Sequence, residues 1–209
     1  MTLPNKLSLS RILVIPLILA TLLAPGTDPS NPLLAAISRA CCLLLVVAAA
    51  ITDYYDGKLA RETGAISNLG KLLDPLADKL LVTAAFVAFV ELQLVPSWLV
   101  IVILCREFLV TGLRTLAAVN GFVMAADRWG KHKTGWQLGA IITTITFLMT
   151  KDFLVAAGVW ADPLVSRFRA DLVYEWGPFL AFLVAVVLTV VSGLNYLRAN
   201  WALIRDSDI

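Results

Sequence analysis

The chain has 209 residues, of which 59% are hydrophobic and only 15% are charged, and its formal net charge is +2. Soluble domains of this length are about 45–50% apolar and about 25% charged, so these values exclude a water-soluble domain. They also exclude a disordered chain, a collagen and a basic nucleic-acid-binding arm, and we expect no nucleic-acid partner. At about 20 residues per crossing, the length has room for about six transmembrane helices.

Six apolar stretches predict six transmembrane helices in one integral-membrane catalytic domain that covers residues 1–209. Backbone groups in hydrocarbon must be hydrogen-bonded within each segment, so the stretches are predicted to be helices and not strands. The first stretch also resembles a signal peptide, but a Pro25-Gly26 turn follows it in place of a small-x-small cleavage motif. The stretches are 9–25, 33–55, 74–95, 98–119, 134–158 and 177–202.

Basic residues are concentrated in the loops on one side of the predicted bundle. The positive-inside rule assigns that side to the cytoplasm, so we predict a multi-pass protein of the cytoplasmic (inner) membrane with both termini inside. The other side carries Lys151, Arg167 and Arg169, with Arg39 near a helix end. The residues of the basic side are Lys6, Arg11, Lys58, Arg61, Lys71, Lys79, Arg128, Lys131, Lys133, Arg198 and Arg205.

Four aspartates lie within the 26 positions that join the second and third predicted spans. Asp53 and Asp56 are three residues apart, and Asp74 and Asp78 are four apart, so each pair shares one face of a helix. Pro75 predicts that the third helix begins there, because proline favours the first helical turn. Oxygen ligands without His or Cys favour Mg²⁺ or Mn²⁺. Four carboxylates suffice for two such ions about 3.5–4 Å apart, an arrangement that supports phosphoryl transfer.

Small residues and one arginine surround these aspartates. Gly57 and Ala60 follow Asp56 and would let a ligand approach the backbone closely, as would Gly70. Arg61 offers a planar fork for phosphate oxygens. Paired aspartates at helix ends can also act as N-caps or as solvated interfacial charges. Acidic residues within spans are costly and usually functional, so the complete array favours a catalytic site.

A second cluster, of cations, could bind an anionic substrate. Arg106 and Arg114 lie inside the fourth span, where an arginine is costly unless it faces a cavity or a partner. The alternatives are a local ion pair with Glu107 for Arg106, and snorkelling to the membrane interface for Arg114. Lys131 and Lys133 would by themselves be ordinary cytoplasmic loop charges. Together the four cations could hold an anionic substrate group such as a phosphate.

The pattern D-x2-D-G-x2-A-R-x8-G-x3-D-x3-D, matched at every fixed position from Asp53 to Asp78, resembles the signature of the CDP-alcohol phosphotransferase family. Other segments are similar to the phosphatidylglycerolphosphate synthases, the branch of this family that uses glycerol 3-phosphate. These segments are Pro4-Asn5-Lys-Leu7-Ser8-Leu-Ser-Arg11, Arg106-Glu107 with Leu113-Arg114, and Gly130-Lys131-His-Lys133-Thr134 with Gln137.

The resemblance implies an all-α fold with six transmembrane helices, a homodimer, and a cytoplasm-facing cavity that holds two Mg²⁺ or Mn²⁺ ions. It also implies that CDP-diacylglycerol, a membrane lipid, is the phosphatidyl donor and that glycerol 3-phosphate is the acceptor. The expected products are phosphatidylglycerol phosphate and CMP.

The resemblance also implies roles for the clustered residues. Asp78 would be the general base and also a metal ligand beside Asp53, Asp56 and Asp74. The residues that border the CDP moiety would be Gly57, Ala60, Arg61 and Gly70. The residues that orient the acceptor phosphate would be Arg106, Arg114, Lys131 and Lys133.

Other functions stay open from the sequence. Within the family, the acceptor could be inositol phosphate, serine or phosphatidylglycerol. In another class, a divalent-cation transporter would also use intramembrane carboxylates, although it would spread them across the bilayer depth and break its helices there. A purely structural membrane protein would tolerate the loss of all four aspartates.

Overall fold

The computed structural model describes residues 3–24, 31–63, 68–119, 128–161 and 170–201. These residues form α-helices and a short 3-10 turn and contain no β-strand, which confirms the all-α prediction. The elements are α1 (Leu3–Leu23), α2 (Pro32–Thr63), α3 (Asn68–Glu91), α4 (Ser97–Val119), α5 (Arg128–Ala156), the 3-10 turn η2 (Val159–Ala161) and α7 (Ala170–Ala199).

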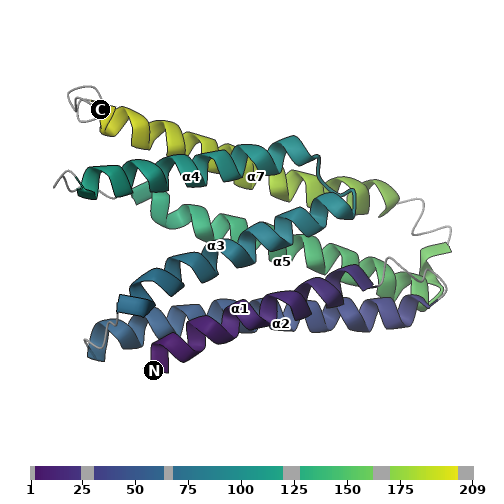
Figure 1. Ribbon diagram of the computed structural model, residues 1–209. Coiled ribbons are helices and arrows are strands. Elements are labelled where there is room, and N and C mark those ends of the chain that lie inside the picture. Colours follow the sequence, from purple (N-terminus) through teal and green to yellow (C-terminus); the bar gives the residue numbers. More distant parts are fainter. Residues whose placement is uncertain (1–2, 25–30, 64–67, 120–127, 162–169, 202–209) are drawn as a thin grey trace.

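The six long helices run roughly along one axis, and successive helices run in opposite directions (Figure 1). We call one end of the bundle the terminal end, because α1 begins and α7 ends there. Helices α2 and α4 end at this same end of the bundle, and α3 and α5 begin there (Figure 1). The other end, where α1, α3 and α5 end and α2, α4 and α7 begin, is called the far end. Helix α1 packs against α2 and α3, and α5 packs against α2 and α7, while α4 packs against α7.

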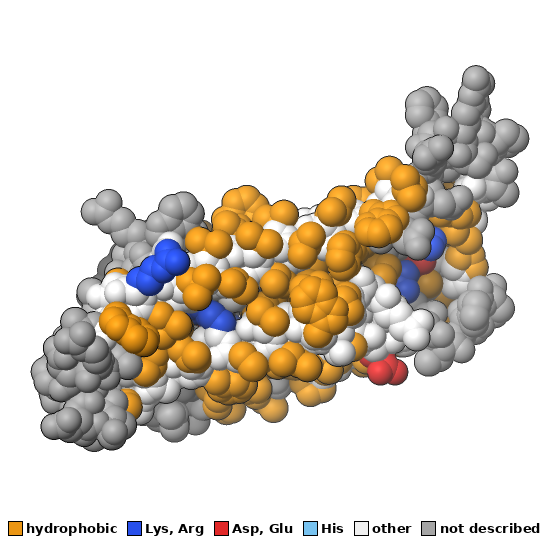
Figure 2. All heavy atoms as spheres, turned by 90° about the horizontal axis from the view of Figure 1, so that it is seen from above, with side chains coloured by type: hydrophobic (Ala, Val, Ile, Leu, Met, Phe, Trp, Pro, Cys, Tyr) orange, Lys and Arg blue, Asp and Glu red, His pale blue; other side chains and the backbone are white. Residues whose placement is uncertain are grey.

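Apolar side chains cover the outside of the bundle as well as its core. Phe86 and Phe182 are fully buried and meet edge to face, with ring centroids 4.7 Å apart. Leu13, Leu44 and Phe108 instead leave 69–70% of their surface exposed. Figure 2 shows hydrophobic side chains over most of the middle of one face. Soluble monomers rarely expose apolar patches larger than a few hundred Å², so this surface belongs in lipid and the protein is membrane-embedded.

The number of membrane crossings is only partly determined by the helices. Among the described residues, three segments are long and apolar enough to cross a bilayer, namely Pro32–Asp53, Thr134–Ala156 and Leu172–Ala199. The apolar part of α1, Leu9–Leu23, is shorter. Helix α4 carries two arginines and a glutamate between its ends. The six predicted helices are therefore present and the protein is multi-pass, while the crossing of all six stays a prediction.

Several helices extend beyond the apolar stretches at the terminal end. Helix α2 continues past the predicted end at residue 55 to Thr63, and α5 begins at Arg128 where residue 134 was predicted. Helix α3 begins at Asn68, so the predicted start at Pro75 is wrong. The physical reason is that an apolar run marks the hydrocarbon layer, whereas helical hydrogen bonding continues through Lys, Arg and Glu, which are good helix formers.

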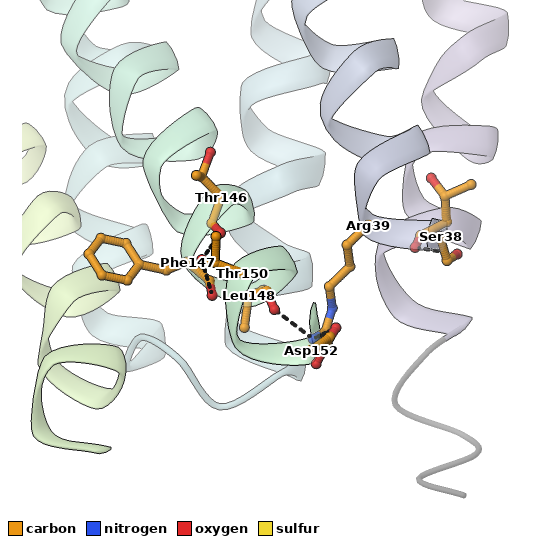
Figure 3. Close-up of polar contacts among 8 residues, drawn as sticks. Ser38, Arg39, Thr146, Phe147, Leu148, Thr150 and Asp152 are labelled. Carbon is orange, nitrogen blue, oxygen red and sulfur yellow. Dashed lines mark hydrogen bonds and ion pairs between the residues drawn. The ribbon is translucent and has the colours of Figure 1, made fainter. Parts of the chain in front are cut away.

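Polar contacts at the far end fix α2 between its neighbours (Figure 3). Arg39 of α2 forms an ion pair with Asp152 of α5, and both side chains are largely buried. The Arg39 Nη1 also lies 3.5 Å from the carbonyl oxygen of Leu148. On the other side of α2, the Ser38 hydroxyl donates a hydrogen bond of 2.9 Å to the carbonyl oxygen of Thr21 in α1. These contacts set the position of α2 relative to both helices.

Candidate active site

Asp53, the first predicted metal ligand, lies on α2 near the terminal end and contacts α1. Its Oδ1 accepts a hydrogen bond of 2.5 Å from Nη1 of Arg11. The Arg11 side chain is only 3% exposed, whereas the Asp53 side chain is 50% exposed. The ion pair therefore joins α1 to α2 and leaves the carboxylate accessible from one side.

The other three aspartates lie on the two successive helices to which the sequence analysis assigned the two aspartate pairs. Asp56 is on α2, and Asp74 and Asp78 are on the first half of α3. Helix α1 packs against both of these helices, whose connected ends lie together at the terminal end of the bundle (Figure 1). The side chains of these three aspartates lie outside the described part of the chain, so the four-carboxylate site stays a prediction. The same holds for the predicted CDP-binding residues Gly57, Ala60, Arg61 and Gly70.

Within the side chains that the structure describes, no three acidic, histidine or cysteine residues lie together. Asp53 is the member of the predicted metal set that falls among them. Arg11 pairs with Oδ1 of Asp53, and half of the Asp53 side chain stays exposed, which leaves room for a hard cation that prefers oxygen ligands.

A cavity of about 500 Å³ lies between α3, α4 and α5. This volume is within the range of about 300–1,000 Å³ that small-molecule sites occupy. Two predicted acceptor-binding residues, Arg106 and Arg114, line it, together with Lys79 of α3. The cavity therefore brings three cations from two helices to one space. The predicted acceptor-binding side chains outside the described part of the chain are those of Lys131 and Lys133.

Arg106 is held across the interface between α4 and α7. Its Nη2 donates a hydrogen bond of 2.9 Å to Ser192 Oγ, and its Nη1 lies 3.5 Å from Glu107 Oε1. The local ion pair that the sequence suggested as an alternative is thus present, yet the same guanidinium also reaches α7 and lines the cavity. The close approach requires Gly193, because a Cβ at that position would lie 2.8 Å from Cγ of Arg106.

Arg114 is exposed and contacts α7. Its Nε donates a hydrogen bond of 3.3 Å to the hydroxyl of the buried Tyr196, and its guanidinium carbon lies 5.1 Å from the centroid of that ring. Such a cation–π contact adds to the hydrogen bond. On the opposite wall of the cavity, Nζ of Lys79 donates a hydrogen bond of 2.5 Å to Thr111 Oγ1. The cavity cations are thus positioned by polar partners on neighbouring helices.

Sequence reasoning missed several residues of this region. Lys79 was interpreted only as a charge that orients the protein in the membrane, and Arg11, although it ends a family-like segment, was given no role in the site. Ser192, Gly193 and Tyr196 belong to no motif. A usable signal was present in α7, because Ser192 and Tyr196 are four residues apart and so share one face of an otherwise apolar helix.

The bundle is thus a membrane-embedded helical protein in which a cationic cavity is lined in part by α3, the helix that carries Asp74 and Asp78. Residues 1–191 match the sequence profile of the CDP-alcohol phosphatidyltransferases. The chain belongs to this family of enzymes, which confirms the resemblance inferred from the aspartate motif.

Curated relatives share this similarity over nearly the whole chain. The chain is 39% identical to the CDP-diacylglycerol–glycerol-3-phosphate 3-phosphatidyltransferase of Bacillus subtilis (strain 168) over an alignment of 213 positions, which covers 99% of this chain and 98% of that protein. A Rickettsia felis protein of the same name is 32% identical over 197 residues, which cover 94% of each chain. A Treponema pallidum protein of that name is 31% identical over 163 residues, covering 78% of this chain and 71% of that protein.

Proposed function

We propose that this protein transfers the phosphatidyl group of CDP-diacylglycerol to glycerol 3-phosphate and releases CMP. The observation that carries this proposal is the cavity lined by Lys79, Arg106 and Arg114, which lies against the helix that bears Asp74 and Asp78. Three cations in one cavity favour an acceptor that carries a phosphate. This argues against serine, and the names of the full-length relatives support glycerol 3-phosphate.

Two divalent cations would bind at the aspartates. The donor set on α2 and α3 consists of carboxylates alone, which suits Mg²⁺ or Mn²⁺, and the exposed side of Asp53 leaves room for such an ion. When bound, the ions would offset the charge of the donor pyrophosphate and stabilise the leaving CMP. The proposed metal ligands are Asp53, Asp56, Asp74 and Asp78. The residues proposed to border the CDP moiety are Gly57, Ala60, Arg61 and Gly70.

The proposed reaction forms one P–O bond and breaks another. The 1-hydroxyl oxygen of glycerol 3-phosphate attacks the phosphorus that carries the diacylglycerol, and Asp78 accepts the hydroxyl proton. The bond from that phosphorus to the bridging oxygen breaks, and CMP leaves with the electron pair.

The cations would hold the acceptor phosphate so that its hydroxyl faces the reacting phosphorus. Positioning of this kind accounts for a large part of enzymatic acceleration. Arg106 suits the task because Ser192 and Glu107 already fix its guanidinium before a ligand arrives. The complete proposed set is Arg106, Arg114, Lys131 and Lys133, to which the cavity adds Lys79.

We place the terminal end of the bundle in the cytoplasm. The support is the excess of Lys and Arg in the segments that lie at this end, together with the positive-inside rule. The protein would then lie in the cytoplasmic membrane with its active site facing the cytoplasm. The family resemblance also leads us to expect a homodimer, which cross-linking in membranes would test.

A divalent-cation transporter is disfavoured by the acids that lie away from the aspartate cluster. Glu107 is 3.5 Å from a nitrogen of Arg106, and Asp152 is paired with Arg39. Each of these carboxylates is therefore offset by a guanidinium, whereas a cation pathway needs negative charge that is open to the passing ion.

The test is CMP release by the purified protein in lipid nanodiscs with CDP-diacylglycerol as donor. We expect release with glycerol 3-phosphate, its loss on chelation, and its return with Mg²⁺ or Mn²⁺. Inositol phosphate, serine and phosphatidylglycerol serve as competing acceptors, and preference for one of them would reassign the acceptor. Metal flux into vesicles without CMP release from any acceptor would replace the proposal with a transporter.

A further inference from the structure

We propose that Arg11 is a positioning residue for the metal site. Its buried guanidinium holds one oxygen of Asp53, so that the rest of the carboxylate is presented to a divalent cation. This role rests on the proposed function, since it requires that Asp53 binds a metal ion. The observation behind it is the hydrogen bond of 2.5 Å between Arg11 Nη1 and Asp53 Oδ1, which joins α1 to α2.

Packing leaves Arg11 little freedom to move. Arg11, Ile15, Ile18 and Leu22 are spaced by three and four residues, so they form one stripe along α1, and all four are buried. Arg11 is the charged member of this stripe, at the point where α1 packs against α2 and α3. Moving its guanidinium into water would require α1 to separate from its neighbours, so its contact with Asp53 is fixed by the fold.

Asp53 has the complementary property, because half of its side chain is exposed. Its Oδ1 accepts the bond from Arg11, and a cation can approach the open side of the carboxylate without displacing the guanidinium. Hydrogen bonds to metal-binding carboxylates fix their orientation, and loss of such a partner typically lowers metal affinity by about 10–100-fold.

The charge of Arg11 has the opposite effect on a cation. If the guanidinium acted only by repulsion, its removal would tighten metal binding. Four aspartates against two arginines, Arg11 and Arg61, still leave an excess of negative charge, so a cation is attracted with Arg11 in place. The sign of the change in metal affinity therefore distinguishes positioning from simple repulsion.

The experiment is a Mn²⁺ titration of the full-length protein in nanodiscs, in which the electron paramagnetic resonance signal of free Mn²⁺ reports binding. We expect Arg11→Gln to weaken Mn²⁺ binding by about 10–100-fold. Arg11→Lys keeps the charge but loses the planar fork, so a smaller loss is expected. Arg39→Gln is the matched control, because it removes the buried arginine from the other interhelical pair of α2. It should lower the melting temperature and leave Mn²⁺ affinity unchanged.

The outcomes separate this role from the proposed function. If the wild type binds Mn²⁺, Asp74→Asn weakens that binding, and the Arg11 variants bind as tightly as the wild type or more tightly, the positioning role is overturned and the metal site stands. If the wild type binds no Mn²⁺, both are overturned. Should Arg11→Gln fail to fold, the test rests on Arg11→Lys. Weaker Mn²⁺ binding by Arg11→Lys at an unchanged melting temperature supports the positioning role. Unchanged Mn²⁺ binding contradicts it.

Discussion

Among the side chains that the structure describes, two arginine–aspartate pairs join α2 to its neighbours, one toward each end of the bundle, and they differ in the exposure of the aspartate. Arg11 and Arg39 are both buried, with side chains 3% and 11% exposed. Asp152 at the far end is also largely buried, at 16%, whereas Asp53 at the terminal end is 50% exposed. A closed pair serves to hold two helices together, while a pair with an open carboxylate can still accept a third partner. The same two residue types thus give a structural contact at one end and a candidate ligand site at the other.

The largest expected difference between the two ends is in turnover. Asp78→Asn should reduce CMP release by about 10²–10⁴-fold, because the amide cannot accept the proton of the attacking hydroxyl. The measurement is CMP release at saturating glycerol 3-phosphate. Asp152→Asn at the far end is the control and should retain kcat in the fraction that remains folded. A near-normal rate for Asp78→Asn would contradict the assignment of the base.

Breaking the Arg39–Asp152 pair at the far end should lower the stability of the protein. Arg39→Met leaves the largely buried carboxylate of Asp152 without its arginine, and breaking one side of such a pair costs about 3–5 kcal/mol. The expected result is a marked fall in the melting temperature of the detergent-solubilised protein. Arg39→Met combined with Asp152→Leu removes both charges and should recover most of the loss. Equal destabilisation of the single and double variants would show that the pair itself has little influence.

Two glycines of α7 allow the ends to be compared on a single helix. A Cβ at Gly193 would lie 2.8 Å from Cγ of Arg106, and a Cβ at Gly177 would lie 2.7 Å from Cζ of Phe147. Gly193→Ala should displace Arg106 and raise the KM for glycerol 3-phosphate about tenfold or more, since a hydrogen bond to a charged group contributes about 1.5–3 kcal/mol. Gly177→Ala should lower stability with no change in KM. The same KM for both variants would show that Arg106 does not contribute to binding of glycerol 3-phosphate.

The smallest expected effect concerns the turn between α3 and α4 at the far end. Gln93 has a φ of 57°, and the amides of Gln93 and Leu94 bond to the carbonyl oxygens of Val90 and Phe89 at 2.9 and 3.0 Å. This hydrogen-bond pattern favours glycine at the left-handed position. Gln93→Gly should therefore stabilise the protein by about 0.5–1 kcal/mol, measured by thermal unfolding, with CMP release unchanged. Gly158, with a φ of 70°, is the matched site, and Gly158→Ala should destabilise the protein.

Much of the fold could be predicted from apolar runs alone. Six such runs correspond to α1, α2, α3, α4, α5 and α7, because a helix in lipid must be apolar over its buried length. The helix ends were predicted less well. The helical part of α2 beyond Asp53 and the start of α3 at Asn68 lie in polar sequence, where hydropathy carries no information about helix continuation.

The sequence by itself determined the family, through the spacing of four aspartates and the small residues between them, since that spacing is local and can be read along the chain. Only the tertiary structure decided which distant residues meet. It brought Arg11 to Asp53, Arg106 to Ser192 and Gly193, and Arg114 to Tyr196. The physical reason is that helix packing sets such contacts across more than 40 positions of the chain, and an arginine in an apolar run shows only that it needs a partner, not which one.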